Sequence, residues 1–155
     1  AEFFLTYKEA YWLTGDYEII DEKGKKIYPF ISFYKKLWRL FPYKTALLLT
    51  NFINQPSTFW RRKIFMEVGE FNINYKYNMD FDYWMRIFNK GYRLYTTNEK
   101  LCRFRIHERS MNKSQYKNLF NHMLYLIRKY SSSKLIYLFN KIHYNLISFI
   151  YSIRK

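Results

Sequence analysis

The sequence predicts an α/β fold in which a helix packs on a small sheet and further helices follow. Four apolar residues recur at the i, i+3, i+4, i+7 spacing of one helix face: Phe81, Trp84, Met85 and Phe88. Strand-like runs follow at 92–97 and 101–106, and the second alternates apolar and basic residues. Helical periodicity returns at 115–130 and 134–154. These observations give the order helix, sheet and helical tail.

The composition is typical of a globular chain, since 49% of the residues are apolar and 23% are aromatic. The formal net charge is +15. A surface for nucleic acid or for an anionic membrane would explain this charge. A general drift of the composition toward Lys, Asn, Tyr, Phe and Ile would explain it as well, so both interpretations stay open.

Cysteine content and hydropathy favour a cytoplasmic location. The single cysteine, Cys102, excludes a disulfide framework and a Cys-rich zinc site, and it fits a reducing compartment. We find no signal-peptide pattern and no run of 18 apolar residues. We therefore expect a cytoplasmic protein, and a peripheral position at the inner face of the cell membrane is compatible with the sequence.

Residues 1–9 are predicted to be the end of a helix. Three short strand segments are predicted after it, at 11–14, 17–20 and 26–30. Gly15 and Asp16 separate the first two strand segments, and a turn signal lies at 22–25. Asp16 is interpreted as a turn acid, with a position facing a functional site as the alternative.

Three helices are predicted next, at 32–40, 43–52 and 61–68. An extended stretch at 57–60 lies between the second and the third. Pro42 ends the first helix, because proline cannot continue a helix, and Gly69 ends the third. These elements carry the chain from the first strands to the central helix.

Two acids, Asp80 and Asp82, stand where the central helix begins. Asn78 or Asp80 can cap this helix, and the helix macrodipole favours ionised carboxylates at its start. Asp82 and Arg86 are spaced i, i+4 and can pair along the polar face. A helix with capping acids is the simplest interpretation, and the neighbouring motifs add a functional one.

Six motifs occur in a fixed order: Gln55, Trp60-Arg61-Arg62, Gly69-Glu70-Phe71, Asp80-Phe81-Asp82-Tyr83-Trp84-Met85-Arg86, Gly91-Tyr92 and Phe104-Arg105-Ile106-His107. Together they resemble the C-terminal half of the catalytic domain of family 2 glycosyltransferases, which have the GT-A fold. The resemblance covers residues 51–114 well and 11–27 more loosely. It implies that residues 1–114 form the acceptor-side half of a GT-A domain without its N-terminal nucleotide-binding βαβ unit, and that 115–155 form a helical extension.

The resemblance also implies a role for each candidate site residue. Asp80 matches the second acid of the family's Glu-Asp pair, which is the general base of an inverting transfer, although Met79 replaces the Glu. The candidates for acceptor binding are Gln55, Trp60, Asp82 and Trp84. His107 matches a histidine that completes the shell of a divalent metal, Mn²⁺ or Mg²⁺.

Asp80-Phe81-Asp82 also spells D-x-D, the family's metal motif, but the family's motif ends a strand whereas this one opens a helix. We therefore expect the metal-binding D-x-D to be absent from this chain. The expected enzyme transfers a sugar from a nucleotide-diphospho-sugar to a glycan or lipid-linked acceptor, in polysaccharide biosynthesis. We expect it to be incomplete within these 155 residues: either the chain is a fragment, as a start on Ala1 also suggests, or a partner supplies the donor side.

The alternative is a basic membrane-peripheral or nucleic-acid-binding module without catalysis. We expect no nucleic-acid partner, because the basic residues are spread along the chain and no RNP-like, KH-like or zinc-finger pattern occurs. Residues 134–154 combine aromatic, aliphatic and Lys residues, which is typical of a helix lying on an anionic membrane. Packing of this helix on the rest of the protein explains the same pattern.

Overall fold

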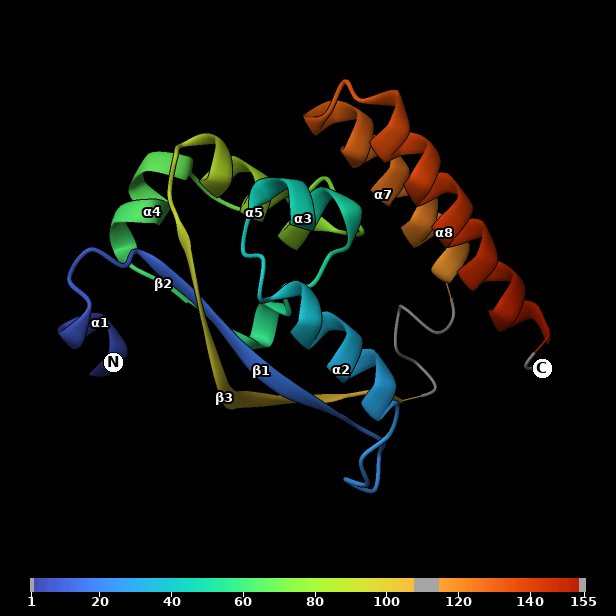
Figure 1. The fold of residues 1–155 in the computed structure, drawn as a ribbon, viewed down its shortest axis with the longest axis horizontal. Helices are drawn as coiled ribbons and strands as arrows, with labels where there is room; N and C mark the ends of the chain where they lie inside the picture. The colour runs from blue at the N-terminus through green and yellow to red at the C-terminus, as the bar shows by residue number, and fades with distance from the viewer. Residues whose placement is uncertain (1, 108–114, 154–155) are drawn as a thin grey trace.

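The computed structural model describes residues 2–107 and 115–153, and it confirms the α/β class (Figure 1). Its mixed sheet has three strands in the order β2-β1-β3. They are β1 (Trp12–Ile20), β2 (Thr58–Trp60) and β3 (Leu94–Arg105). The central strand β1 is antiparallel to β2 and parallel to β3. Every residue of β1 except Glu18 is buried, so this strand forms the middle of the fold.

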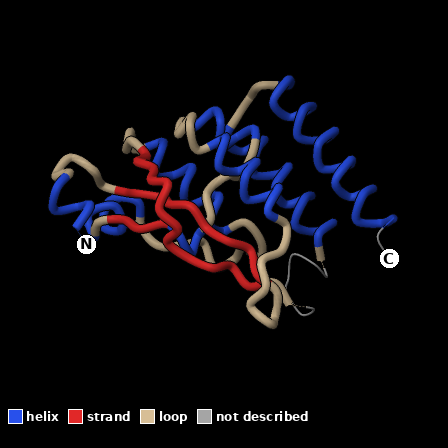
Figure 2. The backbone as a smooth tube through the Cα atoms, turned by 60° about the horizontal axis from the view of Figure 1, so that its bottom comes forward, coloured by secondary structure: helices blue, strands red, loops and turns tan. Residues whose placement is uncertain are grey.

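Strands β1 and β3 are each continuous, although the sequence predicted two segments for each (Figure 2). The irregularity appears instead as register shifts between them on both sides of Asp16, which mark a β-bulge. A Cβ atom on Gly15 would lie 2.4 Å from Cγ of Leu101. Glycine at this position therefore lets the bulged part of β3 pass close to β1.

The segment after β1 differs from the prediction. The returning strand expected at 26–30 is reduced to one isolated bridge between Ile20 and Lys26. Helix α2 spans Pro29–Trp38 and so begins earlier than the predicted 32–40. Proline suits the first position of a helix, because its missing N–H would have no partner inside the helix.

The other helices lie close to their predicted positions. Their bounds are α1 (Glu2–Thr6), α3 (Lys44–Leu49), α4 (Arg62–Val68), α5 (Met79–Asn89), α7 (Tyr116–Tyr130) and α8 (Lys134–Ile153), with a 3₁₀ turn η1 (Gln55–Ser57). Helix α3 is shorter than the predicted 43–52, because Thr50 is already extended, with φ −151°.

Aromatic rings join α5 to the sheet. Trp12 of β1 stacks on Trp84 of α5 with ring centroids 5.7 Å apart, and Trp60 of β2 meets Trp84 edge-on at 5.5 Å. Helix α7 adds three buried apolar side chains to the same core: Met123, Leu126 and Ile127. The sheet and α7 therefore both hold α5 in place.

Helices α7 and α8 lie side by side at the end of the molecule that carries the C-terminus (Figure 1). Asn140 of α8 is fully buried, and its Nδ2 donates a hydrogen bond of 2.9 Å to the carbonyl of Leu48 in α3. This bond attaches the helical extension to the rest of the fold. Within residues 2–107 and 115–153, none of the helices is both long enough and apolar enough to cross a membrane.

Candidate active site

Asp80 is the second residue of α5, at the predicted helix start, but the predicted capping bonds are not made. Asn78 precedes the helix in the left-handed region, with φ 51°, and makes no side-chain capping bond. Its Nδ2 donates instead to the carbonyl of Leu119 in α7, at 2.8 Å. Oδ1 of Asp80 accepts the N–H of the next residue, Phe81, at 2.8 Å. Contact with α7, rather than capping, therefore fixes the entry to α5.

Burial raises the pKa of the Asp80 carboxyl above its usual range. The hydrogen bond from the Phe81 N–H and the charge of Lys35 act in the opposite direction without cancelling this effect. The sequence predicted that the helix start would favour the ionised form, so burial outweighs that preference. A carboxylate with a raised pKa binds a proton more readily, which is the property that a general base needs.

Lys35 of α2 is the cation that acts on Asp80. Burial lowers the pKa of the Lys35 ammonium, and so does the charge of Arg39, while Asp80 acts to raise it. An acid and an amine thus share a region from which much of the water is excluded, and burial favours the neutral form of each. Sequence reasoning missed Lys35, because no spacing rule connects residues that are far apart in the chain.

Helix α2 exposes several large apolar side chains, whereas the basic residue directly after its end is buried. Arg39, which follows the helix directly, is only 3% exposed, whereas Phe30 is 78% and Phe33 is 56% exposed. Nη2 of Arg39 lies 2.5 Å from Oδ1 of Asp16 in β1. The interpretation of Asp16 as a turn acid is therefore wrong, since it lies inside a strand and anchors α2 by a buried ion pair.

Asp82 has surroundings quite different from those of Asp80. It is 1% exposed, and its carboxylate accepts hydrogen bonds from Lys129 Nζ at 2.8 Å and Tyr130 Oη at 2.5 Å. The predicted pair with Arg86 is confirmed at 3.0 Å, although the Asp82 carboxylate is buried between helices. Burial alone would raise the pKa of Asp82, and the bonds from Lys129 and Tyr130 outweigh it and lower the pKa.

The candidates for acceptor binding do not form one surface. Trp84 is fully buried, and Trp60 is partly buried against Phe71, with ring centroids 6.1 Å apart. Asp82 is buried as well, whereas Gln55 is exposed at the start of η1. Of these four residues, Gln55 is exposed and Trp60 is half-buried, whereas Asp82 and Trp84 lie out of reach of a dissolved acceptor. The rings of Trp60 and Trp84 contribute chiefly to packing.

His107 is exposed and follows the C-terminal end of β3. The preceding residue, Ile106, donates its N–H to the carbonyl of Ile20 at 2.8 Å, which continues the pairing with β1. No group of three or more His, Cys, Asp or Glu side chains suited to a metal ion occurs in the described ranges. A metal shell at His107 would need ligands from elsewhere.

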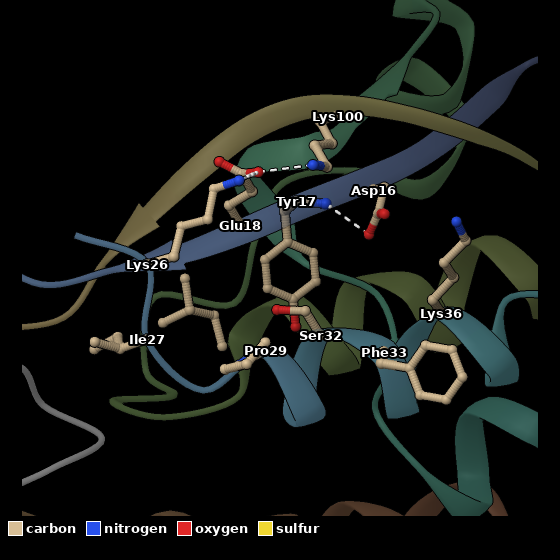
Figure 3. A pocket seen from close by; sticks show the side chains of 11 residues that line it. Asp16, Tyr17, Glu18, Lys26, Ile27, Pro29, Ser32, Phe33, Lys36 and Lys100 are labelled. Atoms are coloured by element: carbon tan, nitrogen blue, oxygen red, sulfur yellow. Dashed lines mark hydrogen bonds and ion pairs between the residues drawn. The ribbon is translucent and has the colours of Figure 1, made fainter. Parts of the chain in front are cut away.

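A hollow of about 250 Å³ lies between β1 and the start of α2 (Figure 3). Hydrogen bonds of 2.7 Å from Lys100 and Lys26 lower the pKa of Glu18 on its rim to about 2. Tyr17 also lines this hollow, and burial raises the pKa of its hydroxyl. Asp80 lies outside the lining, so the hollow and the acid at the start of α5 are separate features.

No protein-family model, curated protein or solved structure matches this chain. The interpretation of the site therefore depends on the residues themselves and on the motifs in their order along the chain.

Proposed function

We propose that this chain forms the acceptor side of a glycosyltransferase that moves a sugar from a nucleotide-diphospho-sugar to a hydroxyl of a glycan or lipid-linked acceptor. Asp80 acts as the general base, and the transfer inverts the configuration of the sugar. One observation carries the proposal: Asp80 is a half-buried residue whose carboxyl has a raised pKa in the field of Lys35. The buried Asp82, in contrast, is occupied by three partners.

The order of the elements supports the partial GT-A fold that we propose for residues 1–114. Helix α5 carries the acid, the chain turns at Gly91, and β3 then runs parallel to β1. The aromatic pair of Trp12 and Trp84 packs the acid-bearing helix on the central strand. We propose that the nucleotide-binding unit comes from another part of the polypeptide or from a partner chain.

In the proposed step, Asp80 accepts the proton of the acceptor hydroxyl while the oxygen attacks the anomeric carbon of the sugar. The bond from this carbon to the diphosphate oxygen breaks, and the diphosphate leaves with the electron pair. The charge of Lys35 favours the ionised form of Asp80 before the transfer, because a nearby cation opposes part of the effect of burial.

A divalent metal, Mn²⁺ or Mg²⁺, would neutralise the leaving diphosphate. The described residues do not form such a site on their own, since no group of three or more His, Cys, Asp or Glu side chains suited to a metal occurs among them. We therefore derive no step through a metal, and we propose His107 only as one ligand of a shell completed by the donor side.

Asp80→Asn tests the proposal in the complete enzyme, with its donor-binding unit present. Asparagine is close in shape to aspartate and is equally suited to a helix start, so the fold should be kept. Transfer should fall by roughly 10²- to 10⁴-fold, the usual contribution of a positioned base. The measurement is release of nucleoside diphosphate in the presence of acceptor.

Glu9→Gln is the matched control, because it removes one carboxylate from an exposed position. It should leave transfer unchanged. Full activity of Asp80→Asn would remove Asp80 as the base, and the absence of any transfer by the wild-type enzyme across nucleotide-sugar donors would remove the proposed function.

A second candidate function, contact with an anionic membrane, is favoured by the outer face of α8. Five of its exposed side chains are apolar: Leu135, Leu138, Phe139, Ile142 and Leu146. Residues 109–155 contain nine Lys or Arg and no Asp or Glu. An apolar helix face within a segment that lacks acids suits a surface of anionic lipid headgroups. We propose that α8 lies on such a surface while the transferase acts.

Replacing Leu138 and Ile142 together by Gln should weaken co-sedimentation with vesicles that contain anionic lipid. The two side chains would each lose roughly 1.5–3 kcal/mol of apolar burial if fully inserted. Replacing Leu37 and Leu40 by Gln is the matched control, since these residues are also exposed leucines but lie in or just after α2. Equal binding by the α8 variant and the wild type would contradict this role of α8.

A further inference from the structure

We propose that a small polar hollow between α2 and the bulge of β3 binds one phosphate-type oxyanion. The hollow has a volume of about 70 Å³. Its lining combines residues from the C-terminal end of α2 with the bulged part of β3: Lys36, Arg39, Leu40, Thr96, Thr97 and Asn98. All but Leu40 carry hydrogen-bonding side chains, and two are cations. The inference is independent of the proposed glycosyl transfer.

Arg39 provides the main argument. Its side chain is 3% exposed, and Nη2 pairs with Asp16, but the buried Nη1 has no hydrogen-bond partner. A buried guanidinium N–H without an acceptor is unfavourable, and such groups in native proteins usually have an ion or water as partner. Arg39 is one of the residues that line the hollow, so the unpaired group belongs to the wall of this site.

The β-bulge provides the second argument. Pairing with β1 moves from Thr14–Thr96 to Asp16–Lys100, so residues 97–99 of β3 have no partner in that register. Oγ1 of Thr97 accepts the N–H of Glu99 at 3.2 Å, which leaves its O–H able to donate to a ligand. Bulges often occur where a strand turns a side chain toward a binding site.

Charge and size select the class of ligand. Lys36 and Arg39 bring two positive charges to the site, and Asp16 offsets one of them, so the remaining charge favours an anion over water. A volume of about 70 Å³ is several times the roughly 10–15 Å³ that a cavity needs to hold one water molecule. One phosphoryl group fits this space, and any organic part of the ligand would extend into solvent beside the exposed Asn98.

Titration calorimetry of the whole chain with inorganic phosphate and with pyrophosphate tests the proposal, at constant ionic strength. Thr97→Val keeps the size of the side chain and removes the hydroxyl, and Lys36→Gln removes one cation. Each variant should weaken binding by roughly tenfold, the contribution of one hydrogen bond to a charged group. Lys90→Gln, at an exposed position after α5, is the control and should bind as the wild type does.

If the wild type binds pyrophosphate more strongly than phosphate, and Thr97→Val and Lys36→Gln both weaken this binding, the hollow is a site for a diphosphate group. Equal binding of both anions would assign it to a single phosphoryl group, and both results support the site. Equal binding by all four proteins, or none by the wild type at millimolar phosphate, overturns it. Thermal unfolding without ligand checks that the variants fold. Because the readout is binding, failure here leaves the test of Asp80 by turnover unaffected.

Discussion

Asp80 and Asp82 lie two residues apart in the first turn of α5, yet their surroundings are opposite. Asp82 is almost fully buried and accepts hydrogen bonds from three side chains: Arg86, Lys129 and Tyr130. Asp80 remains partly exposed, accepts the neighbouring N–H of Phe81 and is influenced by Lys35 without a direct ion pair of the kind that holds Asp82. The pKa of Asp80 is raised and that of Asp82 is lowered.

The macrodipole of α5 acts on both acids in the same direction, so it cannot cause the difference. The cause is what packs against each side of the helix. Helix α7 brings Lys129 and Tyr130 into contact with Asp82, whereas α2 brings only the longer-range charge of Lys35 to Asp80. One acid is thereby an anchor between helices, whereas the carboxyl of the other accepts hydrogen bonds, within the described residues, from backbone N–H groups only.

Asp82→Ala should be the most damaging substitution for stability in this pair. It removes the shared acceptor of two partly exposed cations and a hydroxyl, and each hydrogen bond to a charged group contributes about 1.5–3 kcal/mol. Asp80→Ala should cost about 1 kcal/mol or less, because it removes the hydrogen bond that the carboxyl accepts from the neighbouring Phe81 N–H. Urea unfolding of both variants measures the difference, and a larger loss for Asp80→Ala would contradict the assignment of the anchor.

The two lysines should show a smaller contrast of the same kind. Lys129→Met removes one charged hydrogen bond to Asp82 and should destabilise the fold by about 1–2 kcal/mol. Lys35→Met replaces a largely desolvated ammonium by an apolar chain of similar length, so the fold should be unchanged or slightly more stable. If Lys129→Met and Lys35→Met lower the thermal stability equally, the proposed difference between Asp82 and Asp80 is contradicted.

Local patterns predicted much of the fold. The spacing of apolar residues predicted α5, its i, i+4 spacing predicted the pair of Asp82 and Arg86, and the motif order predicted Asp80 at the helix start. Each of these features depends on residues close together in the chain. The sequence predicted a break in β1 at Gly15 and Asp16, but β1 is continuous there. The extra residues lie in β3, and a bulge in a neighbouring strand cannot be predicted from the residues of β1.

Contacts between distant segments could not be predicted. Lys129 reaches Asp82 across 47 residues of chain, and Arg39 reaches Asp16 across 23. The pattern of α2 predicted an amphipathic helix correctly, but not that its apolar face would be turned outward, with Phe30 and Phe33 exposed. A buried ion pair with β1 determines that orientation, and the periodicity of a single helix contains no information about it.

The pH dependence of the free energy of unfolding follows from the pKa shifts of Asp80 and Asp82. Asp82 has a lowered pKa in the folded state, so its stabilising effect is present above the unfolded value of about 3.9 and is lost as the pH falls through the folded pKa. Asp80 has a raised folded pKa, so its contribution is present below about 3.9 and is lost as the pH rises through the folded value.

Carboxyl ¹³C NMR of this chain tests the central claim most directly, because it reports on each acid without requiring turnover. Spectra of the wild type across pH, assigned with Asp80→Asn and Asp82→Asn, give the two titration curves. We expect Asp80 to titrate above about 3.9 and Asp82 below it. Coincident curves, or Asp82 titrating above Asp80, would contradict the separation of proton acceptor and anchor.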